Sequence, residues 1–114
     1  MHEMSLTECM RELIEAAAQR EKFTHVKTVH LDIGRLSCVE PEALEFCFDA
    51  VMRGGVAEGA RLEITLLPGR AWCQRCATEV DLDDALDPCP HCGAFGLRIT
   101  SGNEMRVKEL EVSM

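Results

Sequence analysis

Four cysteines in two CxxC pairs are the residues whose types and spacing point most clearly to chemistry. The pairs are Cys73 with Cys76 and Cys89 with Cys92, and twelve residues separate them. A CxxC turn puts two sulfurs on one side of a tight loop, so two such turns that face each other offer four thiolates at tetrahedral corners. Zinc accepts this ligand set, and four protein ligands leave no open position for water. The pattern therefore predicts a structural Zn(II) site and not a catalytic one.

Two other uses of the paired cysteines remain as alternatives. Four thiolates also bind iron in rubredoxin-like electron carriers, but such a site needs a protecting shell, and Trp72 and Phe95 are the only aromatic residues nearby. A thioredoxin-like redox pair would need one CxxC at a βα turn near a helix N-terminus, and neither pair lies at one. The odd total of seven cysteines argues against a disulfide framework and favours a reducing compartment.

His2 is the second candidate for metal chemistry. A histidine in a loose tail is usually not a ligand, but a bulky residue at position 2 is expected to keep Met1, and therefore a free amine, in place. The Met1 amine, the His2 imidazole and the deprotonated amides of His2 and Glu3 can together offer a planar set of nitrogens. Square-planar nitrogen ligation favours Ni(II) or Cu(II) over Zn(II). The N-terminus is thus predicted to be an exposed site, suited to a metal that is given away.

The first helix is predicted from Ser5 to about Arg20. Ser5 and Glu8 have the spacing of a capping box, which would leave residues 1–4 outside the helix as a free tail. Apolar side chains then recur at helical spacing and predict one buried face. They are Leu6, Cys9, Met10, Leu13, Ile14 and Ala17.

Two strands and a second helix are predicted before the cysteine pairs. Residues 26–35 and 61–67 alternate in the manner of strands. The second helix begins at Pro41 and ends at Gly54-Gly55. This order indicates a small α+β domain.

The chain from residue 71 onward has a different composition. Residues 71–96 show no helical period and no continuous core pattern, so a bound metal is expected to hold them together. Residues 97–100 and 104–108 resemble a hairpin. The alternation then shifts near Lys108, which predicts a bulge or one strand that serves two sheets in turn. The last segment is expected to return to the first sheet, which makes the cysteine module an insertion.

Composition and charge exclude several classes of protein. The net charge is −8 and the pI is near 4.9, whereas nucleic-acid binders usually carry a basic face. A zinc-ribbon nucleic-acid-binding or regulatory protein remains the alternative function, although Arg75 is the one basic residue of segment 71–96, against five acids. No apolar run approaches a membrane span, and the N-terminus lacks the features of a signal peptide, so a cytoplasmic protein is expected. No nucleophile and base converge, so no enzymatic activity is predicted.

Motifs along the whole chain carry a resemblance to a known family. They are MHEMSL at residues 1–6, PEAL at 41–44, the pattern C-x2-C-x12-C-P-x-C at 73–92, and ELEV at 109–112. On these motifs the chain resembles the HypA/HybF family of nickel-incorporation proteins. The N-terminal MHE together with the double CxxC makes the resemblance specific.

The resemblance implies a fold and a division into domains. The fold is α+β, with two helices on a small mixed three-stranded sheet and an inserted zinc-ribbon-like module with four cysteines. Residues 1–69 with 109–114 would form a nickel-binding domain. Residues 70–108 would form a zinc-binding domain.

The same resemblance implies a nickel metallochaperone for [NiFe]-hydrogenase maturation. Ni(II) would be bound transiently by His2 with the Met1 amine, Glu3 would support this site, and Glu40 would lie near it. The implied partners are a HypB-type GTPase, the hydrogenase large subunit and, in some bacteria, urease maturation proteins. The chain has no P-loop, so any GTP hydrolysis would come from the partner. A monomer or homodimer is expected, with no nucleic acid and no membrane.

The remaining histidines and cysteines receive smaller roles. His25 and His30 bracket the first strand and are expected on the surface or on the sheet face. His91 lies between two zinc ligands and is expected to point away from zinc, with a second nickel ligand as the alternative. The isolated cysteines are predicted in the apolar core at Cys9 and Cys47 and in a loop without an assigned role at Cys38.

Overall fold

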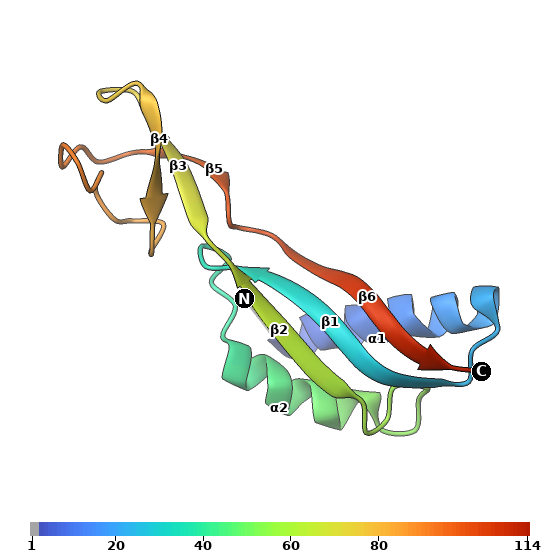
Figure 1. Ribbon diagram of the computed structural model, residues 1–114. Coiled ribbons are helices and arrows are strands. Elements are labelled where there is room, and N and C mark those ends of the chain that lie inside the picture. Colours follow the sequence, from blue (N-terminus) through green and yellow to red (C-terminus); the bar gives the residue numbers. More distant parts are fainter. Residues whose placement is uncertain (1–2) are drawn as a thin grey trace. The chain divides into compact units, whose positions relative to one another are not determined.

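The computed structural model of the chain describes residues 3–114 (Figure 1). The described part forms two three-stranded sheets, with the strand orders β2-β1-β6 and β4-β3-β5. Its helices and strands, in chain order, are α1 (Glu3–Glu21), β1 (His25–Gly34), α2 (Pro41–Met52), β2 (Arg61–Leu67), β3 (Gly69–Cys73), β4 (Thr78–Leu82), β5 (Arg98–Ser101) and β6 (Met105–Ser113).

The chain divides into two compact units. The first comprises the described residues up to Leu31 together with Val39–Ile64 and Val107–Met114, and we call it the helical unit because it contains α1 and α2. The second comprises Asp32–Cys38 and Thr65–Arg106, and we call it the cysteine unit. The expected domain bounds, 1–69 with 109–114 and 70–108, stay a prediction.

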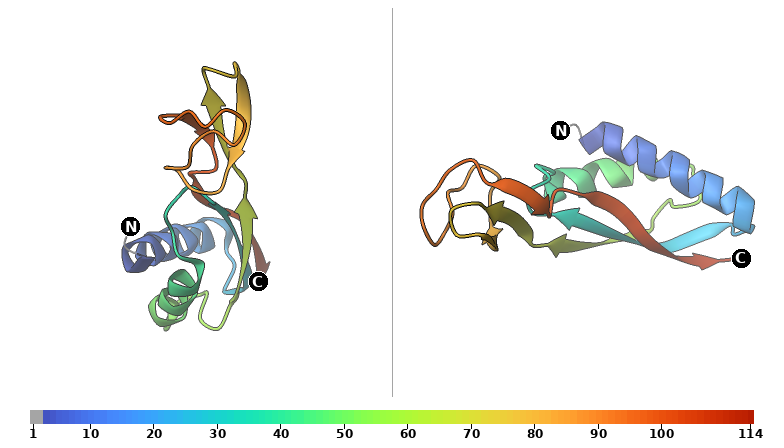
Figure 2. Two further views of the ribbon diagram at one scale, coloured as in Figure 1. Left: turned by 90° about the vertical axis from the view of Figure 1, so that its left-hand side faces the viewer. Right: turned by 90° about the horizontal axis from the view of Figure 1, so that it is seen from above.

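The core of the helical unit forms where both helices cover the same face of the sheet (Figure 2). Ile14 of α1, Val29 of β1 and Leu44 of α2 are fully buried, and Phe48 is 1% exposed. The first sheet is mixed, since β1 and β2 are joined by the α2 crossover while β6 runs back along β1 (Figure 1). The predicted α+β class with two helices on a three-stranded sheet is therefore confirmed.

The start of α1 differs from the prediction. The helix begins at Glu3 and not at Ser5, so Ser5 lies inside it and the predicted capping box and four-residue tail are wrong. The side-chain hydroxyl of Thr7 donates to the carbonyl oxygens of Glu3 and Met4, at 3.1 and 2.9 Å. Because these bonds satisfy the hydroxyl, Thr7 can occupy a fully buried position in the first turns.

The buried face of α1 is turned relative to the prediction. Thr7 takes one of the inward positions, and Leu13 is 56% exposed. Cys9 is exposed as well, so its predicted place in the core is wrong. The buried residues of α1 are Thr7, Met10, Ile14, Ala17 and Ala18.

The second helix begins at Pro41, as predicted, and its last turn is bound by a side chain of α1. Arg11 donates through Nη1 to the carbonyl oxygens of Val51 and Arg53, at 2.6 and 3.0 Å. The last carbonyls of a helix find no donor within the helix itself, so an outside donor satisfies them. The positive charge of Arg11 also interacts favourably with the negative end of the helix dipole.

Replacing Arg11 by methionine should lower the free energy of unfolding by about 1.5–3 kcal/mol, the range for hydrogen bonds to charged groups. The measurement is urea unfolding followed by the helical circular dichroism signal. Arg20→Met serves as the control, because Arg20 is an exposed α1 residue whose only ion pair within residues 3–114, to Glu21, spans 3.9 Å. Equal losses in the two variants would show that Arg11 does not cap α2.

The cysteine unit is built on the antiparallel sheet β4-β3-β5. Ala71 of β3 lies opposite Val80 of β4 and opposite Ile99 of β5. The predicted hairpin of residues 97–100 with 104–108 is wrong, because β5 pairs with β3 while β6 pairs in the other sheet. Since β6 lies in one sheet, it does not serve two in turn, but the predicted return of the last segment to the first sheet is confirmed.

The close approach of three glycines explains why no hairpin forms. Gly102 has a φ of +92°, and an added Cβ there would lie 2.5 Å from the Cα of Gly69. An added Cβ on Gly34 would overlap the carbonyl of Gly102. The carbonyl oxygen of Gly102 instead accepts a hydrogen bond from the Leu36 amide at 2.7 Å. The segment that follows β1 therefore packs against the turn after β5 and bonds to its backbone.

Gly102→Ala should destabilise the cysteine unit by about 3 kcal/mol or more, because left-handed backbone and overpacking each cost roughly 1–3 kcal/mol. Gly96→Ala is the matched control, since Gly96 also has a positive φ but nothing lies within 4 Å of its added Cβ. Urea unfolding followed by tryptophan fluorescence measures both variants. A loss no larger than that of Gly96→Ala would contradict the close packing described here.

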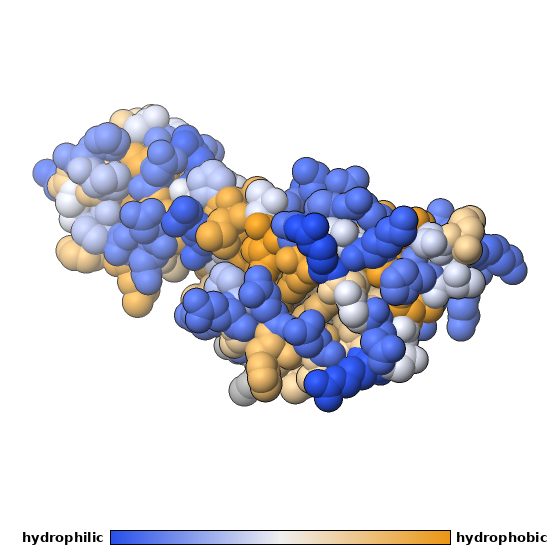
Figure 3. All heavy atoms as spheres, turned by 60° about the horizontal axis from the view of Figure 1, so that its bottom comes forward, coloured by the Kyte–Doolittle hydropathy of each residue, from blue (hydrophilic) through white to orange (hydrophobic). Residues whose placement is uncertain are grey.

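The surface of the protein is largely hydrophilic on the face shown in Figure 3, with hydrophobic residues gathered in separate patches. One of the exposed apolar side chains is Phe46 of α2, which is 77% exposed. Neither described helix is long and apolar enough to cross a membrane.

Candidate metal centre

The four paired cysteines come from two loops of the cysteine unit. In the first pair, Cys73 ends β3 opposite Thr78 of β4, and Cys76 lies in the turn between these strands. The second pair lies in the loop between β4 and β5. Backbone hydrogen bonds close this loop, from Cys89 to the carbonyl of Ala94 at 2.8 Å and from Gly93 to the carbonyl of Cys89 at 2.9 Å. Each pair is thus held by local backbone structure.

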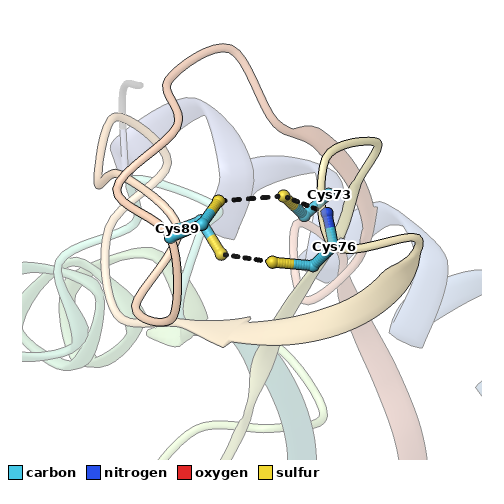
Figure 4. Close-up of side chains that lie close together, drawn as sticks. Cys73, Cys76 and Cys89 are labelled. Atoms are coloured by element: carbon cyan, nitrogen blue, oxygen red, sulfur yellow. Dashed lines mark hydrogen bonds between the residues drawn. The ribbon is translucent and has the colours of Figure 1, made fainter.

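The sulfur atoms of the two pairs face one another (Figure 4). The Sγ atoms of Cys73 and Cys92 are 3.6 Å apart, and those of Cys76 and Cys89 are 3.9 Å apart. All four ligand atoms lie within 4.8 Å of one another. Tetrahedral coordination with Zn–S bonds of about 2.3 Å requires sulfur separations of about 3.8 Å. The cluster therefore fits one four-coordinate metal ion.

Backbone amides and neighbouring thiols shift the pKa values of Cys76 and Cys89 in opposite directions. Burial raises the pKa of the Cys89 thiol, but backbone N–H groups of Cys92 and His91 outweigh this effect and lower the pKa to about 6. Hydrogen bonding with Cys92, followed by burial, raises the pKa of Cys76 to about 12. Four thiolates so close together repel one another, and a divalent cation at their centre removes this repulsion.

The apolar core around the cluster is small. The buried residues of this core are Leu36, Ala71, Cys73, Val80, Leu82 and Cys89. Cys76 and Cys92 pack against them, partly buried. The cysteines thus make up much of the core itself, which supports the expectation that a metal holds this unit together.

The strands β3 and β4 were missed by the sequence analysis. Apolar residues at alternate positions, Ala71 and Cys73 and again Val80 and Leu82, were the available signal, and the structure buries all four. Part of the acidic stretch has a structural role, because Glu79 and Asp81 bind Arg70 at 3.2 and 2.6 Å. The remaining acids include Asp84, which accepts a hydrogen bond from the amide of Leu86 at 2.9 Å in the following turn.

The predicted nickel ligands His2 and the Met1 amine lie outside the described residues. Glu3, in the first turn of α1, is described, and its carboxylate accepts a hydrogen bond from the backbone amide of Glu40 at 3.3 Å. The structure therefore brings together the two acidic positions that the sequence analysis associated with the nickel site.

None of the described histidines belongs to the four-cysteine group. His30 binds the carboxylate of Glu111 through Nε2 at 2.6 Å, which lowers the pKa of Glu111. His25 is exposed at the start of β1. His91 is exposed too, and its backbone amide donates to the sulfur of Cys89 at 3.4 Å. Within residues 3–114, the four paired cysteines form the one group of three or more side chains placed to hold a metal.

Two isolated cysteines remain. Cys38 is exposed in the loop after β1, as its predicted loop position requires, and its φ is +64°. Cys47 is partly buried in α2, so it lies at the border of the core and not inside it.

Comparisons with known proteins agree with this geometry. A family model for hydrogenase/urease nickel incorporation, the metallochaperone hypA, matches residues 1–112. Hydrogenase maturation factor HypA of Albidiferax ferrireducens is 59% identical over 112 residues, which are 98% of this chain and 99% of that protein. The corresponding factor of Azotobacter chroococcum is 54% identical, with the same coverage.

The fold matches a solved structure as well. The solution structure of the Ni metallochaperone HypA from Helicobacter pylori superimposes with a TM-score of 0.71 at 25% identity, over 98% of this chain and 97% of that one. The family model and the curated relatives span nearly the whole chain, both cysteine pairs included. The chain therefore belongs to the HypA family of hydrogenase/urease nickel-incorporation metallochaperones.

Proposed function

We propose that this protein is a nickel metallochaperone that carries Ni(II) at its N-terminus and releases it during [NiFe]-hydrogenase maturation. It also holds one structural Zn(II) through Cys73, Cys76, Cys89 and Cys92. It acts without enzymatic chemistry of its own. A HypB-type GTPase and the hydrogenase large subunit are the expected partners, with urease maturation proteins as further recipients, and the protein works in the cytoplasm.

The closed four-sulfur cluster is the observation that carries this proposal. An ion with four protein ligands and no open position exchanges poorly, so it serves structure and not transfer. A transferable ion needs another site with fewer protein ligands. The N-terminus offers nitrogens to such an ion, and nitrogen ligation in a plane suits Ni(II).

The start of α1 at Glu3 supports an N-terminal site. The first amides of a helix are not used by its own hydrogen-bond ladder, and the positive end of the helix dipole stabilises negative charge. Deprotonated amide ligands are anionic and therefore benefit from this position. The Glu3 carboxylate, bound to the Glu40 amide, ties the start of α1 to the residue before α2. Residues 1–69 with 109–114 are proposed as the nickel-binding domain and residues 70–108 as the zinc-binding domain.

Acid should release nickel before it releases zinc. The His2 imidazole and the Met1 amine must be unprotonated to bind, and in free peptides such groups titrate near pH 6.5 and about pH 8, so nickel affinity falls as pH falls through this range. The four Zn–S bonds should hold to lower pH. A titration from about pH 8 to 6 on tag-free protein, with nickel read by absorbance and zinc by a chelating dye, measures both. Simultaneous release of the two metals would contradict nitrogen ligation at the N-terminus.

The alternative function, a zinc-ribbon protein that binds nucleic acid, has less support. The family match covers nearly the entire length and not the cysteine pairs alone. Two acids of β4 bind Arg70, so this cation of the cysteine unit is not available to phosphates. A gel-retardation assay at low salt distinguishes the two functions.

A further inference from the structure

The cysteine unit contains a cavity of about 280 Å³ beside the four-cysteine cluster. Residues 72–75 and 94–98 line it, so it lies between the end of β3 and the segment that leads into β5. This volume is slightly below the roughly 300–1,000 Å³ of pockets that hold drug-sized ligands. It can therefore take one or two side chains.

Two arginines of this cavity have no acidic partner among the described residues. Arg75 and Arg98 are both exposed, and neither forms an ion pair within residues 3–114. Arg70 of the same sheet, by contrast, is bound by two carboxylates. A guanidinium without a partner presents a planar set of donors that matches a carboxylate.

The strand register places an acid, Glu79, on the same face of the sheet as Arg98. Trp72 lies opposite Glu79 on one side and opposite Arg98 on the other, so the three side chains share a face of the sheet. The carboxylate of Glu79 is bound to Arg70 at 3.2 Å. Arg98 is therefore available to an external anion.

Two aromatic side chains complete the lining. Trp72 is partly buried, whereas Phe95 is 77% exposed, although burying a phenyl ring is normally favourable. Aromatic residues and arginine in one pocket are typical of binding hot spots on protein surfaces. An apolar group of a ligand would cover Phe95 while its acidic group meets the arginines.

The adjoining strand can also accept a peptide backbone. In the described residues β5 pairs only with β3 and is an edge of its sheet. Extended peptides bind exposed sheet edges through main-chain hydrogen bonds, with alternate side chains entering pockets. Arg98 is the first residue of β5, so a peptide on this edge would reach the cavity.

We propose that this cavity binds an extended segment of a partner protein that carries an acidic side chain next to an aromatic or aliphatic one. The carboxylate binds Arg75 and Arg98, and the apolar side chain packs on Phe95 and Trp72. Recognition of this segment is separate from metal loading and does not depend on where nickel binds.

The charge of the protein favours a peptide over a nucleic acid. The whole chain carries a net charge of −8, and residues 79–87 bring five acids into the same unit. Binding of a polyanion draws its strength from many phosphate contacts, and two free arginines cannot supply them. A peptide segment needs only one or two carboxylates.

Tryptophan fluorescence can test the proposal without a label. Trp72 is the only tryptophan of the chain, and there is no tyrosine, so its emission reports on the cavity. The full-length zinc-loaded protein is titrated with an end-blocked peptide of sequence Phe-Glu-Leu-Asp-Phe. Two control peptides replace the acids by their amides or the apolar residues by serine, and a short oligothymidylate competes as the nucleic acid. We expect a saturable response to the first peptide and at least about tenfold weaker binding of both controls.

Variants of exposed residues distinguish specific recognition by the cavity from a general effect of net charge on peptide binding. Arg75→Gln and Arg98→Gln should each weaken the acidic peptide at least about tenfold, and Phe95→Ser should weaken it several-fold. Arg35→Gln is the matched control, since Arg35 is exposed in the same unit but lies outside the cavity. Zinc content and Trp72 emission confirm that each variant is folded. The proposal is overturned by no saturable response, by an equal loss with Arg35→Gln, or by preferred binding of the oligothymidylate.

Discussion

His2→Ala is expected to abolish tight nickel binding while zinc content and the helical signal stay unchanged. The substitution removes the imidazole of the proposed nickel site, and residue 2 precedes α1, which begins at Glu3. The loss in affinity should exceed about a hundredfold, because even partners that merely orient a metal ligand contribute roughly 10–100-fold. Calorimetric titration with Ni(II), on protein that retains its Met1 amine, measures the effect.

Two controls make this result specific. His25→Ala removes an exposed histidine at the start of β1 and should leave nickel affinity unchanged. An extension ahead of Met1 should weaken nickel binding in the wild-type sequence, because it converts the amine into an amide. Unchanged affinity in His2→Ala would move the site elsewhere, with His91 and His30 as the next residues to replace.

Cys73→Ser is expected to cause loss of zinc and unfolding of the cysteine unit, with the helices retained. Cys73 is fully buried and belongs to the small core, and structural zinc contributes about 10–16 kcal/mol to the folding of comparable small modules. The helical unit has its own core, built around Ile14, Leu44 and Phe48, and that core contains no metal ligand.

The two units can be followed separately in one sample. Both helices belong to the helical unit, so far-ultraviolet circular dichroism reports mainly on it, whereas Trp72 fluorescence reports on the cysteine unit. Cys38→Ser is the matched control, an exposed cysteine of the cysteine unit outside the cluster. Native Trp72 emission with one zinc per chain in Cys73→Ser, or parallel loss of the helical signal, would contradict the account.

Local patterns in the sequence were sufficient to predict several features of the fold. The start of α2 at Pro41 could be predicted because proline fits the first turn of a helix. The four-cysteine cluster could be predicted because each CxxC turn brings its own two sulfurs together. The return of β6 to the first sheet was predicted from the shift in its apolar alternation near Lys108.

Features that depend on distant parts of the chain could not be predicted in this way. The start of α1 was misplaced because the spacing of Ser5 and Glu8 also occurs inside helices, and because Thr7 can be buried once its hydroxyl bonds to the helix backbone. The partner of β5 depends on the approach of Gly34 and Gly102, which lie far apart in the sequence. The free arginines of the cavity likewise depend on the register of three strands.

X-ray absorption spectra at the nickel and zinc edges of one doubly loaded sample test the central claim most directly. The account predicts zinc with four sulfur neighbours at about 2.3 Å and nickel with nitrogen or oxygen neighbours only. Sulfur in the nickel shell, or nitrogen replacing sulfur at zinc, would contradict the separation of a closed structural site from an N-terminal transfer site.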